Sequence, residues 1–169
     1  MSNLDFDELR TRMVEVQLVR RCITNDDVLQ AIGRVPRERF VPAALQAAAY
    51  DDGALPIDCE QTISQPYIVA LMTEFLELDG HERVLDVGTG SGYQAAVLAE
   101  LAAEVVTIER HPALARQAAE RVNALGYRNV QFVHGDGTLG WPERAPYDGI
   151  LVAAATDEIP PALLEQLAE

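Results

Sequence analysis

The segment that most constrains the fold is VLDVGTGSGY, residues 84–93. Gly88, Gly90 and Gly92 follow a short apolar run and precede a helical segment, residues 93–102. Glycine lets the backbone turn sharply and approach a ligand closely, and the start of a helix offers unpaired N–H groups. The pattern therefore predicts a strand–loop–helix unit that binds a ligand. The alternative is a tight turn without a ligand.

Strand and helix signals alternate from this segment onward. This alternation is typical of a parallel sheet with helices on both faces, because parallel strands need crossover helices. The strands lack polar alternation, as expected for strands buried on both sides. We predict strands at residues 83–88, 104–109, 130–135 and 147–155, and helices at 93–102, 112–125 and 159–169.

The N-terminal part of the chain is predicted to be helical. Asn25 and Thr24 precede a short helix as capping residues, and Gly33 ends it. We treat residues 1–169 as one domain, with a helical N-terminal region (1–78) and an α/β core (79–169). We also expect helices at 4–21, 42–50 and 65–77 and a loop at 51–64. The helix at 65–77 should have one apolar face, made by Ile68, Leu71, Met72, Phe75 and Leu76.

The charge of the chain limits its partners. The formal net charge is −14, which argues against nucleic acid, since phosphate binding needs a basic surface. No apolar run approaches the roughly 20 residues of a membrane helix. The first residues, MSNLDFDELRTR, show no secretory signal. We therefore expect a cytoplasmic protein without membrane partners.

Cysteine and histidine residues show no metal-binding pattern. Cys22 and Cys59 are expected to be free thiols. His81, His111 and His134 are scattered, so no metal site is predicted.

The positions of acidic residues indicate the cofactor class. The dinucleotide fingerprint G-x-G-x-x-G would need glycine where Tyr93 stands, which disfavours a nicotinamide oxidoreductase. Asp86, two residues before the first glycine, would repel a pyrophosphate but suits a cation. Glu109 ends the second strand, where an acid accepts hydrogen bonds from ribose hydroxyls. S-adenosyl-L-methionine fits both acids; a solvated strand end is the alternative for Glu109. Asp136 could reach the adenine amino group, or could simply form an Asp-Gly turn.

Five segments together carry a family resemblance. In their order and spacing, they resemble protein-L-isoaspartate O-methyltransferases, over nearly the whole chain from about Asp26 onward. TISQP placed before the glycine loop, with VPRERFVP before it, is much more specific than the loop alone. The segments are VPRERFVP (35–42), ALPIDCEQTISQPYIVALMTEFLEL (54–78), VLDVGTGSGY (84–93), GDGTLGW (135–141) and APYDGILVAAATDEIPPALLEQL (145–167).

The resemblance implies a Rossmann-like class I methyltransferase fold and the methylation of L-isoaspartyl α-carboxylates in damaged proteins and peptides. It gives Ser64 the active-site role; a plain N-cap of helix 65–77, with Pro66 in the first turn, is the alternative. A carboxylate is ionised at neutral pH, so no general base is required. The cofactor-binding positions implied are Gln61, Thr62, Ile63, Asp86, Gly88, Gly90, Glu109, Asp136 and Gly137.

The sequence departs from the family in two places. Asp58, Cys59 and Glu60 follow the LPI segment, where the family usually has glycine first. Two acids near a site for an anion should weaken binding unless they point away. The chain also ends at Glu169, before strands that the family has.

We therefore expect four strands in the order 3-2-1-4, with an exposed fourth strand, weak cofactor binding and low turnover. Two alternatives stay open: a class I methyltransferase for another carboxylate or small molecule, and a non-catalytic cofactor-binding remnant.

Overall fold

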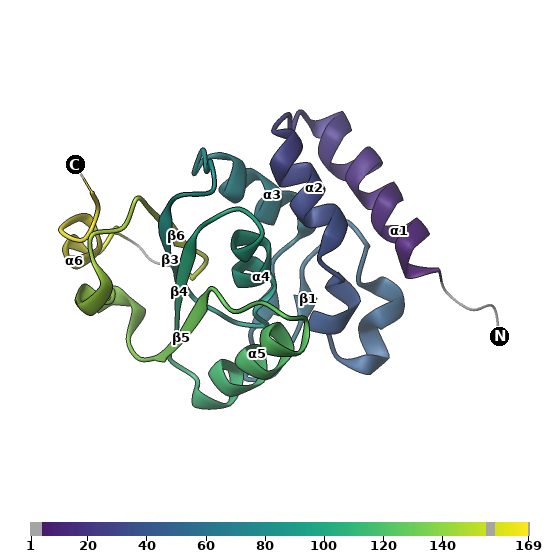
Figure 1. Ribbon diagram of the computed structural model, residues 1–169. Coiled ribbons are helices and arrows are strands. Elements are labelled where there is room, and N and C mark those ends of the chain that lie inside the picture. Colours follow the sequence, from purple (N-terminus) through teal and green to yellow (C-terminus); the bar gives the residue numbers. More distant parts are fainter. Residues whose placement is uncertain (1–4, 155–157, 169) are drawn as a thin grey trace.

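Four parallel strands form the central sheet in a computed structural model that describes residues 5–154 and 158–168. The strand order is β5-β4-β3-β6, which confirms the predicted order 3-2-1-4 (Figure 1). Each predicted strand is found within about two residues of its expected start. The bounds are β3 Arg83–Val87, β4 Glu104–Glu109, β5 Val130–His134 and β6 Gly149–Val152.

The register brings the carboxyl ends of the strands to one edge of the sheet. Val87, the last residue of β3, is paired with Ile108 on one side and Val152 on the other. Glu109 is paired with His134 one residue further along. The loops that follow all four strands therefore start close together, as is usual for ligand sites of parallel sheets.

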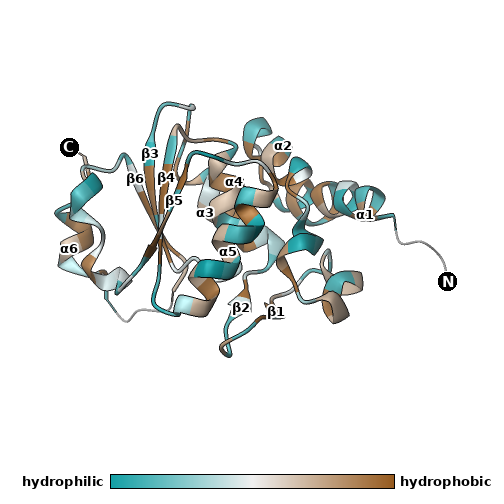
Figure 2. Ribbon diagram, turned by 60° about the horizontal axis from the view of Figure 1, so that its bottom comes forward, coloured by the Kyte–Doolittle hydropathy of each residue, from teal (hydrophilic) through white to brown (hydrophobic). Residues whose placement is uncertain are grey.

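Helices cover both faces of the sheet, as predicted. α4 (Tyr93–Ala99) and α5 (Pro112–Ala124) lie on one face, and the short α6 (Pro161–Leu164) lies on the other (Figure 2). Every residue of α4 from Tyr93 to Leu98 is buried, because the N-terminal helices cover the side of α4 that faces away from the sheet. A helix without a solvent-facing side is a central core element.

The N-terminal region is helical, although the expected helix over residues 4–21 changes type along its length. α1 (Phe6–Met13) continues as a π-helical turn, Val14–Leu18, and a 3-10 turn, Val19–Arg21. Cys22, with φ of 67°, ends it. The next helix, α2 (Asp26–Arg34), confirms the predicted cap, since the Asn25 side chain accepts from the backbone N–H groups of Asp27 and Val28. It continues through Gly33 rather than ending there.

The segment expected to be a loop contains a small hairpin. β1 (Leu55–Pro56) pairs antiparallel with β2 (Thr62–Ile63). Two-residue strands leave no periodic signal in a sequence, which is why the pattern missed them. The expected short helix at 42–50 is a 3-10 helix, Ala43–Ala48, and another 3-10 turn, Arg37–Phe40, precedes it.

The apolar face predicted for helix 65–77 is confirmed only in part, since Leu71, Met72 and Leu76 are partly buried and pack against the core, but Ile68 and Phe75 do not. α3 (Pro66–Glu74) buries Val69, Ala70 and Thr73, whereas Phe75 is 77% exposed and Ile68 is 38% exposed. The helix ends at Glu74, so Phe75 does not extend its face. Nearly all positions of α3 are apolar, so packing against α2 and the π-helical turn, rather than periodicity, selects the buried side.

β6 forms the edge of the sheet in the described part of the chain, where it pairs only with β3. Its side chains are less exposed than expected, because Leu151 is buried and Ile150 and Val152 are half-buried. On this side of the sheet, exposed apolar residues lie in and around α6, at Ile159 and Leu164. No helix among residues 5–154 and 158–168 is long and apolar enough to cross a membrane.

Two substitutions in and after α3 test the corrected face. We expect Val69→Ala to lower the free energy of unfolding by about 2 kcal/mol, since it removes two buried methyl groups and leaves a cavity. Phe75→Ala should change it by less than about 0.5 kcal/mol, as at other exposed positions. Urea unfolding of both variants checks this. Equal losses, or a larger loss at Phe75, would contradict the observed packing.

Candidate active site

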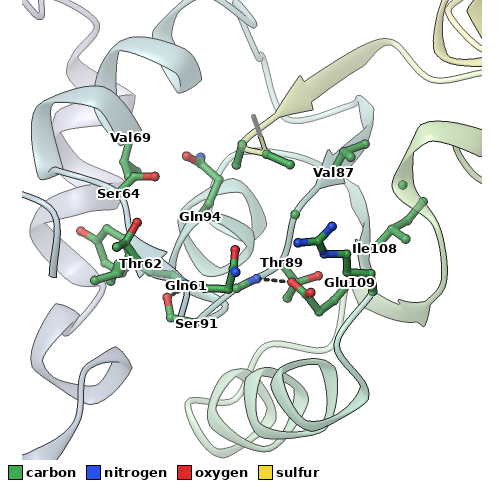
Figure 3. Close-up of a pocket in the computed structure, with 18 of the residues that line it drawn as sticks. Gln61, Thr62, Ser64, Val69, Val87, Thr89, Ser91, Gln94, Ile108 and Glu109 are labelled. Atoms are coloured by element: carbon green, nitrogen blue, oxygen red, sulfur yellow. Dashed lines mark hydrogen bonds between the residues drawn. The ribbon is translucent and has the colours of Figure 1, made fainter. Parts of the chain in front are cut away.

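A cavity of about 470 Å³ lies between the β1–β2 hairpin and the carboxyl edge of the sheet. This volume lies within the usual range of small-molecule sites, roughly 300–1,000 Å³. The hairpin forms one wall, and the glycine loop and the end of β4 form the opposite wall (Figure 3). Nine of the ten predicted site residues line it: Gln61, Thr62, Ile63, Ser64, Gly88, Gly90, Glu109, Asp136 and Gly137.

The N–H groups of the glycine loop are largely occupied by protein acceptors. Gly88 and Thr89 both donate to the Ile108 carbonyl, at 2.9 and 3.1 Å. Gly90 donates to the Glu109 carboxylate at 2.9 Å. A phosphate-binding loop needs such groups free and no carboxylate beside them. The loop therefore does not suit a phosphate, which agrees with the interpretation of its glycine spacing.

Two glycines of the loop are required by its geometry. Gly88 has φ of 102°, a backbone conformation that side chains rarely adopt. Gly92, with φ of 90°, begins α4, and a Cβ atom there would lie 3.0 Å from the Cβ atom of Ala118 on α5. The loop can therefore turn from β3 into a helix that packs closely on its neighbour.

Glu109 is held by the backbone on both carboxylate oxygens. Oε2 accepts from the N–H of Gly90, and Oε1 accepts from the N–H of His111 at 2.9 Å. The residue is 5% exposed and lines the cavity. A carboxylate has about four acceptor sites, so two are left for hydroxyl groups of a ligand. The alternative of a solvated strand end does not describe this buried, fixed side chain.

Asp86 is the one predicted site residue that does not line the cavity. It is fully buried beneath the loop, and its Oδ2 atom accepts from the Thr107 hydroxyl at 2.8 Å. Thr107 in turn lies 2.6 Å from the hydroxyl of Thr89, which does line the cavity. Burial, with a smaller contribution from the charge of Glu109, raises the pKa of Asp86 to about 7 despite the Thr107 hydrogen bond. Direct contact with a cofactor stays a prediction; the geometry links Asp86 to the cavity through two hydroxyl groups.

Ser64 lies in the hairpin wall with its hydroxyl group available. Its carbonyl oxygen accepts from Arg37 Nη2 at 2.8 Å, and no protein group in the described residues hydrogen-bonds its Oγ atom. The N-cap position of α3 is Gln65, without a side-chain capping bond, and Pro66 begins the helix. The alternative interpretation of Ser64 as a plain N-cap is therefore wrong.

Asp136 combines a turn with a place in the cavity wall. Its Oδ1 atom accepts from the hydroxyl of Thr138 at 2.8 Å and from its N–H at 3.0 Å. These hydrogen bonds lower the pKa of the Asp136 carboxyl. The Asp-Gly turn is thus real, and it orients an acceptor at the same edge of the sheet as Glu109.

The two extra acids of the hairpin do not line the cavity. Asp58 accepts from Gln117 Nε2 of α5 at 3.0 Å, and Glu60 is exposed at the hairpin tip. Gln117 accepts from Arg121 at 3.1 Å, and Arg121 donates to the Ser91 carbonyl at 3.4 Å. A chain of hydrogen bonds therefore joins the hairpin tip to α5 and the glycine loop.

Gln94 and Arg110 are among the cavity residues that the sequence analysis did not single out. Gln94 lies between the two walls in Figure 3, and its Nε2 atom donates to the Thr73 hydroxyl at 2.9 Å. The only indication of Gln94 in the sequence is that it is a polar residue within the otherwise apolar segment of α4. Arg110 is the only positively charged residue among the described residues that line the cavity. It gave no signal except its place directly after Glu109.

No metal centre is found in the described residues, where no group of three or more His, Cys, Asp or Glu side chains could hold a metal ion. Cys22 and Cys59 are free and exposed.

Comparison of the sequence with protein families gives one match, the model described as protein-L-isoaspartate(D-aspartate) O-methyltransferase, over residues 8–169. A similar protein is protein-L-isoaspartate O-methyltransferase 1 of Syntrophobacter fumaroxidans, which is 58% identical over 98% of this chain and 78% of the relative. Another is protein-L-isoaspartate O-methyltransferase 2 of Marinobacter nauticus, 57% identical over 97% of this chain and 75% of the relative.

Two solved structures are similar in fold. One, a protein-L-isoaspartate O-methyltransferase, is 36% identical with a TM-score of 0.86, and the match covers 95% of this chain and 52% of that chain. The other comes from Plasmodium falciparum, in complex with S-adenosyl-L-homocysteine. It is 26% identical with a TM-score of 0.80, and the match covers 99% of this chain and 81% of that chain.

The buried carboxyl of Asp86 predicts a pH effect on stability. Its pKa is raised on folding from 3.8 to about 7, so the folded state holds this proton more tightly than the unfolded chain. Its contribution to stability is therefore present at acid pH and lost as the pH rises from about 4 to 7. The loss is at most about 4 kcal/mol, since each tenfold change in proton affinity is worth about 1.4 kcal/mol.

The Asp86→Asn variant has no ionisable group at this position, so it does not lose this contribution as the pH rises. Its free energy of unfolding should therefore increase relative to that of the wild type between pH 5 and pH 8. Urea unfolding at both pH values measures this difference. Glu60→Gln, at an exposed position, is the control and should show no such trend. A difference between Asp86→Asn and wild type that is the same at both pH values would contradict the raised pKa.

Proposed function

The chain belongs to the protein-L-isoaspartate(D-aspartate) O-methyltransferase family, and we propose that the cavity between the hairpin and the sheet edge is its active site. Its reaction is the S-adenosylmethionine-dependent methylation of L-isoaspartyl residues in proteins and peptides. One observation carries the assignment to this cavity: the carboxylate of Glu109 lies on one wall, and the hydroxyl of Ser64, to which no described protein group hydrogen-bonds, lies on the opposite wall.

The glycine-loop wall fits S-adenosylmethionine. The acceptor sites left on Glu109 suit two ribose hydroxyls, and the occupied N–H groups of the loop suit a ligand without phosphate. Asp136 offers an acceptor for the adenine amino group at the same edge. When bound, S-adenosylmethionine supplies a methyl group on a positively charged sulfur, which the acidic residues of this wall favour.

The hairpin wall fits the carboxylate that accepts the methyl group. We assign Ser64 to hold this carboxylate through its hydroxyl, while Arg110, directly after β4 on the opposite wall, supplies the only positive charge among the described cavity residues. Gln94 lies between the two walls, where its amide can orient either ligand. Thr62 and Ile63 of β2, with Gln61 directly before them, border the cofactor from the hairpin.

Methyl transfer to a carboxylate depends on the alignment of the two reactants more than on proton transfer. An α-carboxyl group has a pKa of about 3.5 and is ionised at neutral pH, so it is a nucleophile without a general base. Holding two reactants in line is worth up to about 7–11 kcal/mol. A cavity that fixes both partners with hydrogen bonds is therefore sufficient for this reaction, without proton abstraction by a general base.

The partners follow from charge and chemistry. The net charge of −14 favours protein and peptide substrates over nucleic acid. We propose that the chain acts on such substrates in the cytoplasm, an environment suited to its two free cysteines.

The function is tested by methyl transfer from labelled S-adenosylmethionine to two peptides that differ only in one residue, L-isoaspartyl or L-aspartyl. We expect the label on the isoaspartyl peptide alone, because only the isoaspartyl linkage, which runs through the β-carbonyl, leaves the α-carboxylate free. Labelling of neither peptide, with S-adenosylhomocysteine still bound, would favour a non-catalytic cofactor-binding protein. If only a different carboxylate or a small molecule is labelled, the protein is a class I methyltransferase with another substrate.

Two substitutions separate the two walls of the cavity. Ser64→Ala should lower kcat by about 10–100-fold, since a hydrogen bond to a charged group is worth about 1.5–3 kcal/mol, and should leave the Kd of S-adenosylhomocysteine nearly unchanged. Glu109→Ala should raise that Kd by about 100-fold, because two hydroxyl partners are lost.

Calorimetric titration and steady-state kinetics measure both effects. Glu60→Ala is the matched control, an exposed acid that does not line the cavity. A Ser64→Ala variant that loses cofactor affinity as strongly as turnover would overturn the division of the walls.

A further inference from the structure

A fully buried guanidinium group lies behind the hairpin wall of the cavity. Arg37, in the 3-10 turn Arg37–Phe40, is 0% exposed. Its Nε atom donates to the carbonyl of Ala49 at 2.7 Å, and its Nη2 atom donates to the carbonyl of Ser64 at 2.8 Å. Arg37 does not line the cavity, so it reaches the site through the backbone of Ser64.

No carboxylate compensates this charge in the described residues. The neighbouring Glu38 accepts from the hydroxyl of Tyr50 instead, and Arg37 forms no ion pair there. Its Nη1 atom is buried without a hydrogen-bond partner. Burial lowers the pKa of Arg37, and a buried charge without an opposite charge is expensive. Such a side chain is a poor choice if filling the core were its only task.

The same guanidinium also contacts the other wall. It lies over the ring of Tyr93, 4.9 Å from the ring centroid. Tyr93 is the first residue of α4, directly after the glycine loop, and it lines the cavity. Arg37 therefore connects the wall that carries Ser64 with the start of the helix that follows the glycine loop.

We propose that Arg37 is a positioning residue for methyl transfer, which fixes the Ser64 carbonyl and so aims the Ser64 hydroxyl at the substrate carboxylate. This inference rests on the proposed role of Ser64. Fixing the carbonyl fixes the peptide plane, and with it the direction of the Ser64 side chain, whose hydroxyl has no hydrogen-bond partner among the described residues. A displacement of about 1 Å in such a group can cost 100-fold in rate.

The first test compares Arg37→Gln and Arg37→Lys with wild type. We expect kcat to fall at least tenfold in Arg37→Gln and less in Arg37→Lys, which keeps the positive charge but lacks the planar fork that reaches two carbonyls. The Kd of S-adenosylhomocysteine should stay within threefold, because the glycine-loop contacts are intact. Activity is expressed per S-adenosylhomocysteine site, so unfolded molecules do not enter the comparison. Loss of S-adenosylhomocysteine binding in both variants would assign Arg37 to folding alone and overturn the proposal.

Arg39 provides the matched control, since it lies in the same 3-10 turn but is exposed. Arg39→Gln and Arg39→Lys should leave kcat and both ligand affinities unchanged. An equal loss of kcat in the Arg39 variants would show that the charge of this turn, rather than the Arg37 contact, matters.

A double-mutant cycle tests whether Arg37 acts through Ser64. In the Ser64→Ala background no hydroxyl is left to aim, so Arg37→Gln should change kcat by less than threefold. The same fold loss in both backgrounds would show that the two residues act independently, and this result contradicts the proposal.

Amide hydrogen exchange gives a readout that does not depend on activity. In Arg37→Gln, exchange should become at least tenfold faster at residues 62–68, with the strands of the central sheet unchanged. A wild-type chain that methylates no isoaspartyl peptide refutes the proposed function, and exchange then decides on Arg37 by itself. A selective increase at 62–68 supports the anchoring of Ser64, whereas a uniform or absent change overturns it.

Discussion

The burial of α4 from Tyr93 to Leu98 is the constraint on which the rest of the structure depends. A helix with no solvent-facing side must be covered on all sides. The sheet covers one side, and the N-terminal helices and α5 cover the others. Its first turn, at Tyr93, therefore has to meet both the glycine loop and the N-terminal region. The cavity forms at this end of the helix, where the hairpin faces the loop, so the site unites residues that are far apart in the sequence.

The electrostatics at the loop depend on how two acids, Glu109 and Asp86, are held by protein hydrogen bonds. Glu109 is fixed by two backbone N–H groups, which makes its carboxylate part of the loop. Asp86 is fixed by a threonine hydroxyl and by burial. The backbone N–H groups of the loop already donate to protein acceptors, so they leave little positive potential for binding a phosphate. The same arrangement accommodates a ligand with hydroxyl groups and a positive charge, and this gives a physical reason for the departure from the dinucleotide fingerprint.

The sequence was sufficient where one local rule dominates. The strands of the sheet, the Asn25 cap and the glycine loop were predicted because burial on both faces, capping and positive φ each leave a local signature. The buried face of α3 was predicted only in part, because a helix that is apolar at nearly every position carries no sequence signal for which side is buried, and packing decides it. Asp86 was predicted to line the cavity because the order of residues along the chain does not show how deeply a side chain is buried. The contact between Arg37 and Ser64 could not be predicted because it joins residues 27 positions apart. The misses share one cause: they are decided by distant partners.

The departure at the hairpin shows how such a distant partner changes the meaning of a residue. Cys59 and Glu60 both have positive φ, 57° and 58°, a conformation that costs a non-glycine residue roughly 1 kcal/mol or more. The hydrogen bond from Gln117 to Asp58 holds the turn against α5 and offsets part of this cost. The acid that charge alone would count as repelling an anionic substrate instead points away from the cavity and tethers the wall that carries Ser64. At this position the direction of the carboxylate, rather than its presence, determines its effect on the site.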